Sequence, residues 1–273
     1  MSSLHRTWRL GFIWPALALI AAGAAVSVPA RADVCAAKSG RDAVALVELY
    51  TSEGCNSCPP ADRWLATTFL KGAAGAAAIP LAFHVDYWDR LGWKDRFASP
   101  AYTERQYVAM RANRAGFVYT PQVLVQGKDF PEWRGRGSAA LAMAHPTPAR
   151  ADIALEAESE RGSLAVKAST RIAGAADRKG AALFIALADD GLASDVKAGE
   201  NKGERLTHDH VVRLLRTAPA PDANGEVRWQ VVLPLPAERG SGSTLVAFVQ
   251  NAQTGDVLQA LSLPLVAACA PGH

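Results

Sequence analysis

The first half of the chain alternates short apolar runs with amphipathic segments of helical length. The apolar runs have the length and β-prone composition of buried strands, and the amphipathic segments place their apolar side chains on one helical face. Strands are expected at 43–50, 79–86 and 116–127, and helices at 61–71, 100–115 and 137–145. Ser99 is a suitable cap for a helix whose first residue is Pro100. Strands and helices that alternate in this way predict an α/β domain over residues 33–146.

The second half of the chain carries only strand-length patterns. The proline-rich segment HPTPAR at 145–150 precedes it and is expected to be a linker. Seven segments then alternate between apolar and polar positions or run apolar: 152–158, 163–172, 181–188, 206–215, 227–236, 244–250 and 257–265. Turn signals such as ERGS, NG and QTGD separate several of them. Seven short strands predict an all-β, immunoglobulin-like sandwich domain over residues 151–268.

The amino-terminal end has the pattern of a secretory signal peptide. Two arginines precede an apolar run at 10–28, and Ala30 and Ala32 form a small-x-small cleavage signature. An uncleaved membrane anchor is the alternative, because the run is close to the lower limit of a membrane span, about 18 residues. Pro15 and the many small residues favour cleavage. We therefore expect a signal peptide at residues 1–32, a periplasmic or secreted protein, and no stable membrane insertion after cleavage.

Charge gives no sign of a nucleic-acid partner. Cleavage after residue 32 removes three arginines and no acidic residue, which leaves 26 basic and 26 acidic side chains. A neutral chain has no net electrostatic attraction for nucleic acid or for an anionic membrane surface. We therefore expect neither as a partner.

Four cysteines remain after the signal peptide, two near the ends of the chain and two close together. Unpaired thiols seldom persist in an oxidising compartment. Cys35 and Cys269 are therefore expected to form a structural disulfide that joins the first residues to the tail at 269–273. Cys55 and Cys58 are then left to pair with each other.

Cys55 and Cys58 have the C-x-x-C spacing of a redox site. Thiol–disulfide exchange requires an exposed thiolate of low pKa beside a second thiol that resolves the mixed disulfide. Pro59 and Pro60 fit the first turn of a helix that starts at Ser57, because the N–H groups of that turn have no partner in the helix. Cys55 is then expected just ahead of the helix, where the helix dipole favours a thiolate.

The same spacing is also half of a zinc site. A tetrahedral zinc ion needs two further ligands, and the candidates are His84, His208 and His210. The sequence contains no second C-x-x-C, and alternate histidines such as those of HDH are more often ordinary polar residues. We therefore expect no metal and no other cofactor at the pair.

Three segments resemble a known family: YTSEGCNSCPPAD at 50–62, HVDYWDRLGW at 84–93 and YTPQVLV at 119–125. They are similar to a secreted bacterial thioredoxin-like family, domain of unknown function 1223, and the similarity covers nearly the whole chain after the signal peptide. The order strand, C-x-x-C, helix, strand, helix and Thr-Pro also resembles the thioredoxin fold. The resemblance implies that Pro121 is a cis-proline packed against the cysteine pair and that Thr120 faces the substrate.

Thioredoxins also carry a buried acid beneath the cysteine pair. Glu48 lies in the corresponding strand but one residue off the expected spacing, and a charge at the sheet surface or a structural ion pair is the alternative interpretation. Asn56 and Ser57 replace the usual dipeptide between the thiols, and that dipeptide is a main control on the reduction potential. The sequence therefore leaves open whether the chain oxidises or reduces its partner.

The loop HVDYWDRLGWKD is a further candidate for the site. Its residues His84, Asp86, Trp88 and Trp93 are expected to line a groove around Cys55, because loops at the carboxyl ends of strands line the sites of α/β sheets. The alternative is that the tryptophans cover the core and the aspartates cap turns.

The stretch GENKGERLTHDHVVRLLR is the most polar part of the second half. Its Arg205, His208, His210 and Arg213 are candidates to bind an anion or to contact the first domain. A solvated hairpin is the interpretation that the composition favours.

The sequence supports three functions. The first is an exported thiol–disulfide oxidoreductase in which Cys55 attacks, Cys58 resolves, and Thr120 and Pro121 position a protein or small-molecule thiol or disulfide. The second is a non-catalytic binding module on a thioredoxin scaffold, with a structural disulfide at the pair. The third is a copper or soft-metal carrier that uses both thiolates and His84. The sequence has no nucleophile-elbow, P-loop or zincin motif, so hydrolase and nucleotide chemistry have no support.

Overall fold

The computed structural model describes residue 1 and residues 35–69, 78–135 and 147–265. Ala32–His273 forms one compact unit. Three expectations depend on residues outside the described ranges: the signal peptide at 1–32, the helix at 137–145, and the disulfide of Cys35 with Cys269. Within the described ranges, no helix has the length and apolar character needed to cross a membrane.

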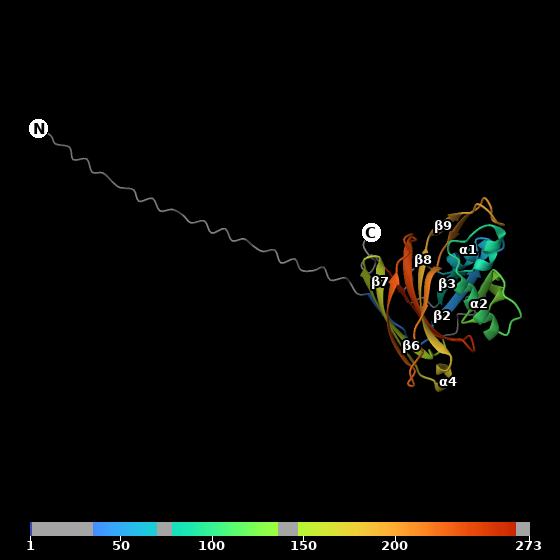
Figure 1. Ribbon diagram of the computed structural model, residues 1–273. Helices are drawn as coiled ribbons and strands as arrows, with labels where there is room; N and C mark the ends of the chain where they lie inside the picture. The colour runs from blue at the N-terminus through green and yellow to red at the C-terminus, as the bar shows by residue number, and fades with distance from the viewer. Residues whose placement is uncertain (2–34, 70–77, 136–146, 266–273) are drawn as a thin grey trace. The chain divides into compact units, whose positions relative to one another are not determined.

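An eight-stranded mixed sheet is the largest element of the fold (Figure 1). In order across the sheet, its strands are β14 (Val257–Pro264), β13 (Gly242–Asn251), β8 (Ala181–Asp190), β11 (Val211–Thr217), β3 (Ala78–His84), β2 (Ala45–Thr51), β4 (Gln122–Val125) and β5 (Lys128–Asp129). β3 runs parallel to β2 and to β11, and the other neighbours are antiparallel. The described chain is therefore mostly β, with a mixed sheet and few helices.

Helical segments from the first half lie beside this sheet: α1 (Pro59–Thr68), η1 (Asp86–Leu91), α2 (Pro100–Ala112) and η2 (Pro131–Arg134). Neighbouring residues of β2 point to opposite faces. Leu49 packs with Leu65 of α1, whereas Tyr50 belongs to a different core cluster that contains Tyr102 of α2. α1 and α2 therefore cover opposite faces of the sheet. The Ser99 hydroxyl accepts a 3.3 Å hydrogen bond from Ala101 N, which confirms the expected cap of α2.

A second, four-stranded antiparallel sheet contains β1 (Cys35–Lys38), β6 (Ala151–Glu160), β7 (Ser163–Ile172) and β12 (Glu226–Pro234). Its strands bury alternate side chains, and Leu155 and Leu164 share one core cluster with Ile185 of β8 and Leu245 of β13. The two sheets therefore pack against each other across this core. The hairpin of β9 (Leu192–Asp195) and β10 (Arg205–His208) and the short helix α4 (Ala175–Arg178) are the remaining described elements.

All seven strand-length segments of the second half contain a strand. The segment expected as one strand at 206–215 forms two, β10 and β11, because His210 between them adopts a φ of 59°. The sequence does not predict β9.

The boundary expected at 145–150 does not separate two sheets. β11, from the second half, pairs with β3, from the first, through Val211 and Ala82, and Ala82 N donates a 2.8 Å hydrogen bond to His210 O. Without β11, this edge of β3 would present unpaired N–H and C=O groups. Strands from both sides of the expected boundary therefore belong to one sheet within one compact unit.

Candidate functional site

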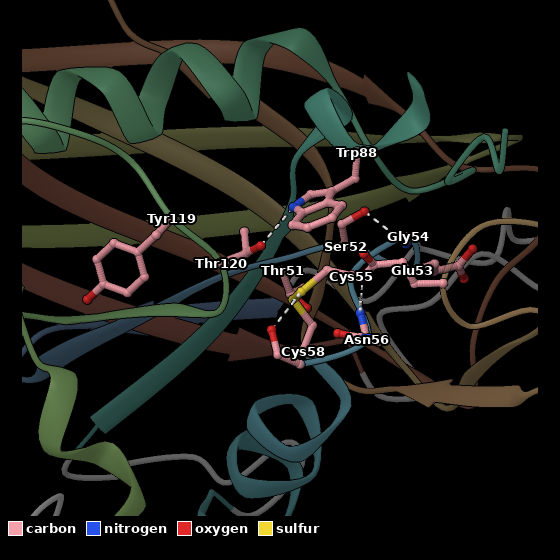
Figure 2. The surroundings of a disulfide bond; sticks show 12 residues. Thr51, Ser52, Glu53, Gly54, Cys55, Asn56, Cys58, Trp88, Tyr119 and Thr120 are labelled. Carbon is pink, nitrogen blue, oxygen red and sulfur yellow. Dashed lines mark hydrogen bonds between the residues drawn. A yellow bond between two sulfur atoms is a disulfide. The ribbon is translucent and has the colours of Figure 1, made fainter. Parts of the chain in front are cut away.

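Cys55 and Cys58 form a disulfide in the turn between β2 and α1 (Figure 2). Their Cα atoms are 5.5 Å apart, which is an ordinary separation for a disulfide. Both residues are 0% exposed, whereas Asn56 and Ser57 between them are exposed. The Ser57 hydroxyl lies 3.4 Å from Cys55 Sγ. The turn therefore meets solvent through the two intervening residues, while the bonded cysteines are enclosed.

The burial of Cys55 corrects the expectation of an exposed sulfur. Two distant segments pack on the turn. Trp88 of η1 backs Gly54 so closely that a Cβ there would lie 3.1 Å from Trp88 Cβ. From the loop between β9 and β10, Asn201 contacts the Cys55 carbonyl. A thiol can therefore reach the disulfide only when part of this packing opens.

The start of α1 also differs from the expectation. Cys58 is the residue that caps the helix, so Pro59 and Pro60 occupy the first two helical positions and the helix does not begin at Ser57. These positions suit proline because their N–H groups have no partner within a helix. The first available donor, Ala61 N, bonds the Cys58 carbonyl at 2.8 Å. The helix therefore offers Cys55 fewer free N–H donors than the sequence suggested.

The Thr120–Pro121 peptide bond is cis, as the resemblance implies, and Pro121 is buried. Tyr50 pairs with Gln122 across β2 and β4, so Pro121 lies at the end of β2 from which the cysteine turn departs. Thr120 Oγ1 accepts a 2.8 Å hydrogen bond from Trp88 Nε1. Figure 2 shows Thr120 and the Trp88 indole beside the disulfide.

Gln106 of α2 holds the backbone on either side of Pro121. Its Nε2 donates to Tyr119 O at 2.8 Å and to Gln122 Oε1 at 2.9 Å, and the side chain is fully buried. The loop that carries Thr120 is therefore fixed to α2 as well as to η1. The sequence offers no signal for this role of Gln106.

Glu53 occupies a buried pocket of polar side chains next to the disulfide turn. Its carboxylate accepts a 2.7 Å hydrogen bond from Trp93 Nε1 and lies 3.3 Å from His208 Nε2 of β10. Burial is the largest single effect on the pKa of Glu53 and raises it, but the hydrogen bonds with His208, Ser194 and Trp93 together outweigh burial, and the pKa lies below its ordinary value. Glu53 is therefore held as a carboxylate inside the protein.

His84 and Asp95 form a second buried pair in the same region. His84 Nδ1 lies 2.7 Å from Asp95 Oδ2, and Asp95 also accepts the Glu53 N–H at 2.9 Å. Burial would lower the pKa of His84, but the Asp95 carboxylate raises it above its ordinary value. Burial would likewise raise the pKa of Asp95, and His84 lowers it. The rings of His84 and His208 are 4.9 Å apart, so the two pairs form one cluster.

Asp62 of α1 faces the same cluster. Its carboxylate accepts a 3.2 Å hydrogen bond from the Thr51 hydroxyl at the end of β2. Burial raises the pKa of Asp62, although His208 and His84 oppose the shift. Among the described residues, no group of three or more histidine, cysteine and carboxylate side chains has an arrangement that could hold a metal ion.

Glu48 lies on the other face of β2, away from α1. It forms a buried 2.8 Å ion pair with Arg105 of α2 and accepts a 3.0 Å hydrogen bond from the Tyr50 hydroxyl. The Arg105 guanidinium also lies 4.9 Å from the ring centre of Phe248. The offset of one residue from the expected spacing explains this position, because a shift of one along a strand reverses the face. The structural ion pair is thus the interpretation that the geometry favours.

The other residues of the candidate loop have separate places. Asp86 accepts a 2.6 Å hydrogen bond from Thr103 and so anchors η1 to α2. Trp88 lies beside the disulfide, while His84 and Trp93 belong to the buried cluster. Trp88 is therefore the residue of this loop that lies beside the disulfide, while His84 and Trp93 pack behind the cysteine turn.

The polar stretch at 199–216 is a solvated hairpin only in part. Arg205 is exposed and pairs with Asp195, whereas His208 is buried against Glu53. Asn201 is also buried, and it contacts the cysteine turn. The contact of this stretch with the first half, one of the alternatives from the sequence, is therefore present.

Residues 46–250 match the protein family described as "Protein of unknown function (DUF1223)". A crystal structure of a protein from Agrobacterium tumefaciens is similar with a TM-score of 0.55 and 27% identity, covering 82% of this chain and 96% of that chain. The structure of HBP35 of Porphyromonas gingivalis is similar with a TM-score of 0.60 and 13% identity, covering 82% of this chain and 75% of that chain. At that identity, the second likeness concerns the fold alone. No curated protein matches the chain.

Proposed function

We propose that this chain, which belongs to the DUF1223 family of proteins of unknown function, is an exported thiol–disulfide oxidoreductase. In the reducing direction, the Cys55 thiolate attacks a partner disulfide, forms a mixed disulfide and releases one partner thiolate. The Cys58 thiolate then attacks Cys55 Sγ and releases the second partner thiolate. Two electrons pass from the cysteine pair to the partner, and the reverse sequence oxidises a partner dithiol.

The observation that carries the proposal is the Cys55–Cys58 disulfide at the start of α1, next to the loop of Thr120 and Pro121. A disulfide of two residues so close in sequence closes a very short loop, and by restricting the unfolded chain it contributes less to stability than a disulfide that closes a long loop. A redox role accounts for the pair better than a structural one. The Ser57 hydroxyl, 3.4 Å from Cys55 Sγ, is a suitable donor for a Cys55 thiolate.

The proposal includes a thioredoxin-like arrangement of the first half. The parallel pair β2 and β3, the antiparallel strand β4 and the helices α1 and α2 on opposite faces support it. An immunoglobulin-like arrangement of the strands from β6 onward is proposed on the packing of β6, β7 and β12 against β8 and β13. The signal-peptide pattern at 1–32 supports export to the periplasm or beyond the cell.

A second candidate is a non-catalytic binding module with a permanent disulfide. The observation that favours it is the complete burial of Cys55 and Cys58. Exchange requires an attacking thiolate in line with one sulfur, and an enclosed bond resists such attack.

Equilibration with glutathione separates the two candidates. The oxidised chain is incubated with increasing ratios of reduced to oxidised glutathione, and the fraction of free Cys55 and Cys58 is measured by alkylation and peptide mapping. The oxidoreductase predicts complete exchange and a midpoint within the range of known exchange proteins, about −120 to −270 mV. A disulfide that stays intact below about −300 mV supports the permanent disulfide instead.

A further inference from the structure

The loop between β9 and β10 reaches from the second half of the chain to the cysteine turn. Asn201 of this loop is 6% exposed, and its Nδ2 donates to Glu53 O at 2.8 Å and to Cys55 O at 3.0 Å. These two carbonyls flank Gly54. The side-chain amide of Asn201 therefore binds the main chain on both sides of Gly54, the residue before Cys55.

Glu200 adds a third contact to the same turn. Its Oε2 accepts a 3.0 Å hydrogen bond from Asn56 N, the first N–H after Cys55. Glu200 is exposed, unlike Asn201. The buried Asn201 therefore holds the Cys55 carbonyl, and the exposed Glu200 holds the N–H of the next residue, Asn56.

The loop itself is well supported. Its backbone closes through Val196 N to Glu204 O at 2.9 Å and Glu204 N to Asn201 O at 3.0 Å. Gly199, with a φ of +74°, packs against Trp93, where a Cβ would come within 3.3 Å of Trp93 Cβ. Because Trp93 also binds Glu53, the loop and the cysteine turn share the same neighbour. The backbone of Asn201 is therefore held in place by contacts within its loop and with Trp93.

We propose that Asn201 is a positioning residue for the Cys55–Cys58 pair, and that it sets how readily the two thiols close to a disulfide. The proposal rests on the proposed function, since it concerns the redox equilibrium of the same pair. The physical reason is preorganisation: two groups held in the bonding geometry react with each other at a much higher effective concentration than two groups on a loose turn.

Loss of the two hydrogen bonds from Asn201 should favour the reduced, dithiol form of the pair. The reaction is protein disulfide plus two reduced glutathione molecules giving protein dithiol plus oxidised glutathione, with two electrons and two protons passing to the protein. Freeing the Cys55 main chain lowers the effective concentration of Cys55 toward Cys58 in the reduced protein. The equilibrium constant for reduction is then expected to rise about three- to tenfold, and tenfold corresponds to about 30 mV for this couple.

The test compares Asn201→Ala with a matched variant, Asn251→Ala. Asn251 is 4% exposed, and its Nδ2 also donates to two backbone carbonyls, of Asp177 at 3.3 Å and Lys179 at 2.8 Å. It therefore loses the same kind of contact in a different turn. Both variants should lose thermal stability, but only Asn201→Ala should shift the redox equilibrium. An equal shift in both, or none in Asn201→Ala, overturns the proposal.

Glu200→Ala keeps the test decisive if Asn201→Ala does not fold. The exposed Glu200 carboxylate can be removed with little effect on stability, and the variant should shift the equilibrium in the same direction by about two- to threefold. A wild-type constant in Glu200→Ala would then count against positioning by the loop. Each equilibrium is measured in dithiothreitol as well as glutathione buffers. If dithiothreitol reduces the disulfide but glutathione does not, the proposed function is wrong. The equilibrium constants measured in dithiothreitol still show whether Asn201 affects closure of the disulfide.

Discussion

Trp88 Nε1 donates a 2.8 Å hydrogen bond to Thr120 Oγ1, which joins η1 to the residue before Pro121 (Figure 2). The Cβ atom and the carbonyl oxygen of the same tryptophan lie against Gly54. Trp88 thus links the cysteine turn to the loop of Thr120, the two parts that a partner of the proposed oxidoreductase would meet. Cys55 and Cys58 are fully buried, and this link is part of the packing that encloses them.

Replacing Trp88 by phenylalanine should make the disulfide easier to reach. The variant keeps an aromatic ring but loses the donor to Thr120, and one hydrogen bond contributes about 0.5–1.5 kcal/mol net. We expect dithiothreitol to reduce the disulfide about two- to tenfold faster, as measured by the appearance of free thiols. The control is Trp229→Phe in β12, which lies in the four-stranded sheet and should leave the rate unchanged. A wild-type rate for Trp88→Phe would show that this contact does not limit access.

Ser57→Ala should slow the reaction of Cys55 in the reduced protein. The Ser57 hydroxyl lies 3.4 Å from Cys55 Sγ, and a hydroxyl donor stabilises the thiolate, which is the reactive form. We expect alkylation by iodoacetamide at neutral pH to be about two- to fivefold slower. Asn56→Ala alters the other exposed residue between the thiols, keeps the Ser57 hydroxyl and should react at the wild-type rate. Equal rates for all three proteins would exclude the hydroxyl as a donor.

The Glu48–Arg105 ion pair should matter for stability and not for redox chemistry. Glu48 is 1% exposed, so Arg105→Met leaves a buried carboxylate without its partner, at a cost of about 3–5 kcal/mol. The double variant Glu48→Leu/Arg105→Met should recover most of this loss, because no charge is left buried. Urea unfolding measures the stability, and the glutathione equilibrium of the double variant should match the wild type. A changed glutathione equilibrium in the double variant would show that Glu48 or Arg105 affects the redox chemistry of the cysteine pair.

The sequence predicts the parts of the site that are local, and misses the parts that long-range packing creates. C-x-x-C followed by two prolines predicts a turn and a helix, and both are present, with the helix starting two residues later than expected. Alternation along β2 could have placed Glu48 on the face opposite α1, because the offset of one residue is visible in the sequence. Asn201 has no such signal, since it lies 146 residues from Cys55 and only the fold brings the two together.

The pairing of strands from both sides of residues 145–150 shows the same limit. Composition changes after residue 150, and each of the seven segments expected as strands contains a strand, although the segment at 206–215 forms two. Pairing across the boundary depends on the contact of Val211 with Ala82. Neither of the two segments has a sequence pattern that identifies the other as its partner. Periodicity indicates which residues are buried in a strand, but not which strand lies beside it.

His84 should make the stability of the protein depend on pH. Its pKa in the folded protein is raised, so its contribution is complete below the unfolded value of about 6.5 and is lost as the pH rises through the folded value. The pKa of Asp95 is lowered, so its contribution is present above about 3.9 and is lost as the pH falls through the folded value. Both contributions are therefore complete between about pH 4 and 6.5.

We therefore expect His84→Asn to reduce the free energy of unfolding more at pH 5.5 than at pH 9. Urea unfolding at the two pH values measures the difference. In an Asp95→Asn background, the same substitution should show a smaller pH dependence, because the carboxylate that raises the pKa of His84 most is gone while Asp62 and Glu53 remain. A loss that is equal at both pH values in the wild-type background would contradict a charged His84 in the pair.

The central claim is that Cys55 exchanges disulfides with a partner while Cys58 resolves the product. Its most direct test is Cys58→Ser, which retains Cys55 but removes the resolving thiol. After incubation of the folded variant with oxidised glutathione, mass spectrometry with peptide mapping locates any mixed disulfide. We predict that one glutathione is bound to Cys55 in the variant. In the wild type, Cys58 should release this glutathione by forming the disulfide with Cys55. A folded variant whose Cys55 remains unmodified under conditions that fully modify a free thiol peptide would contradict the claim.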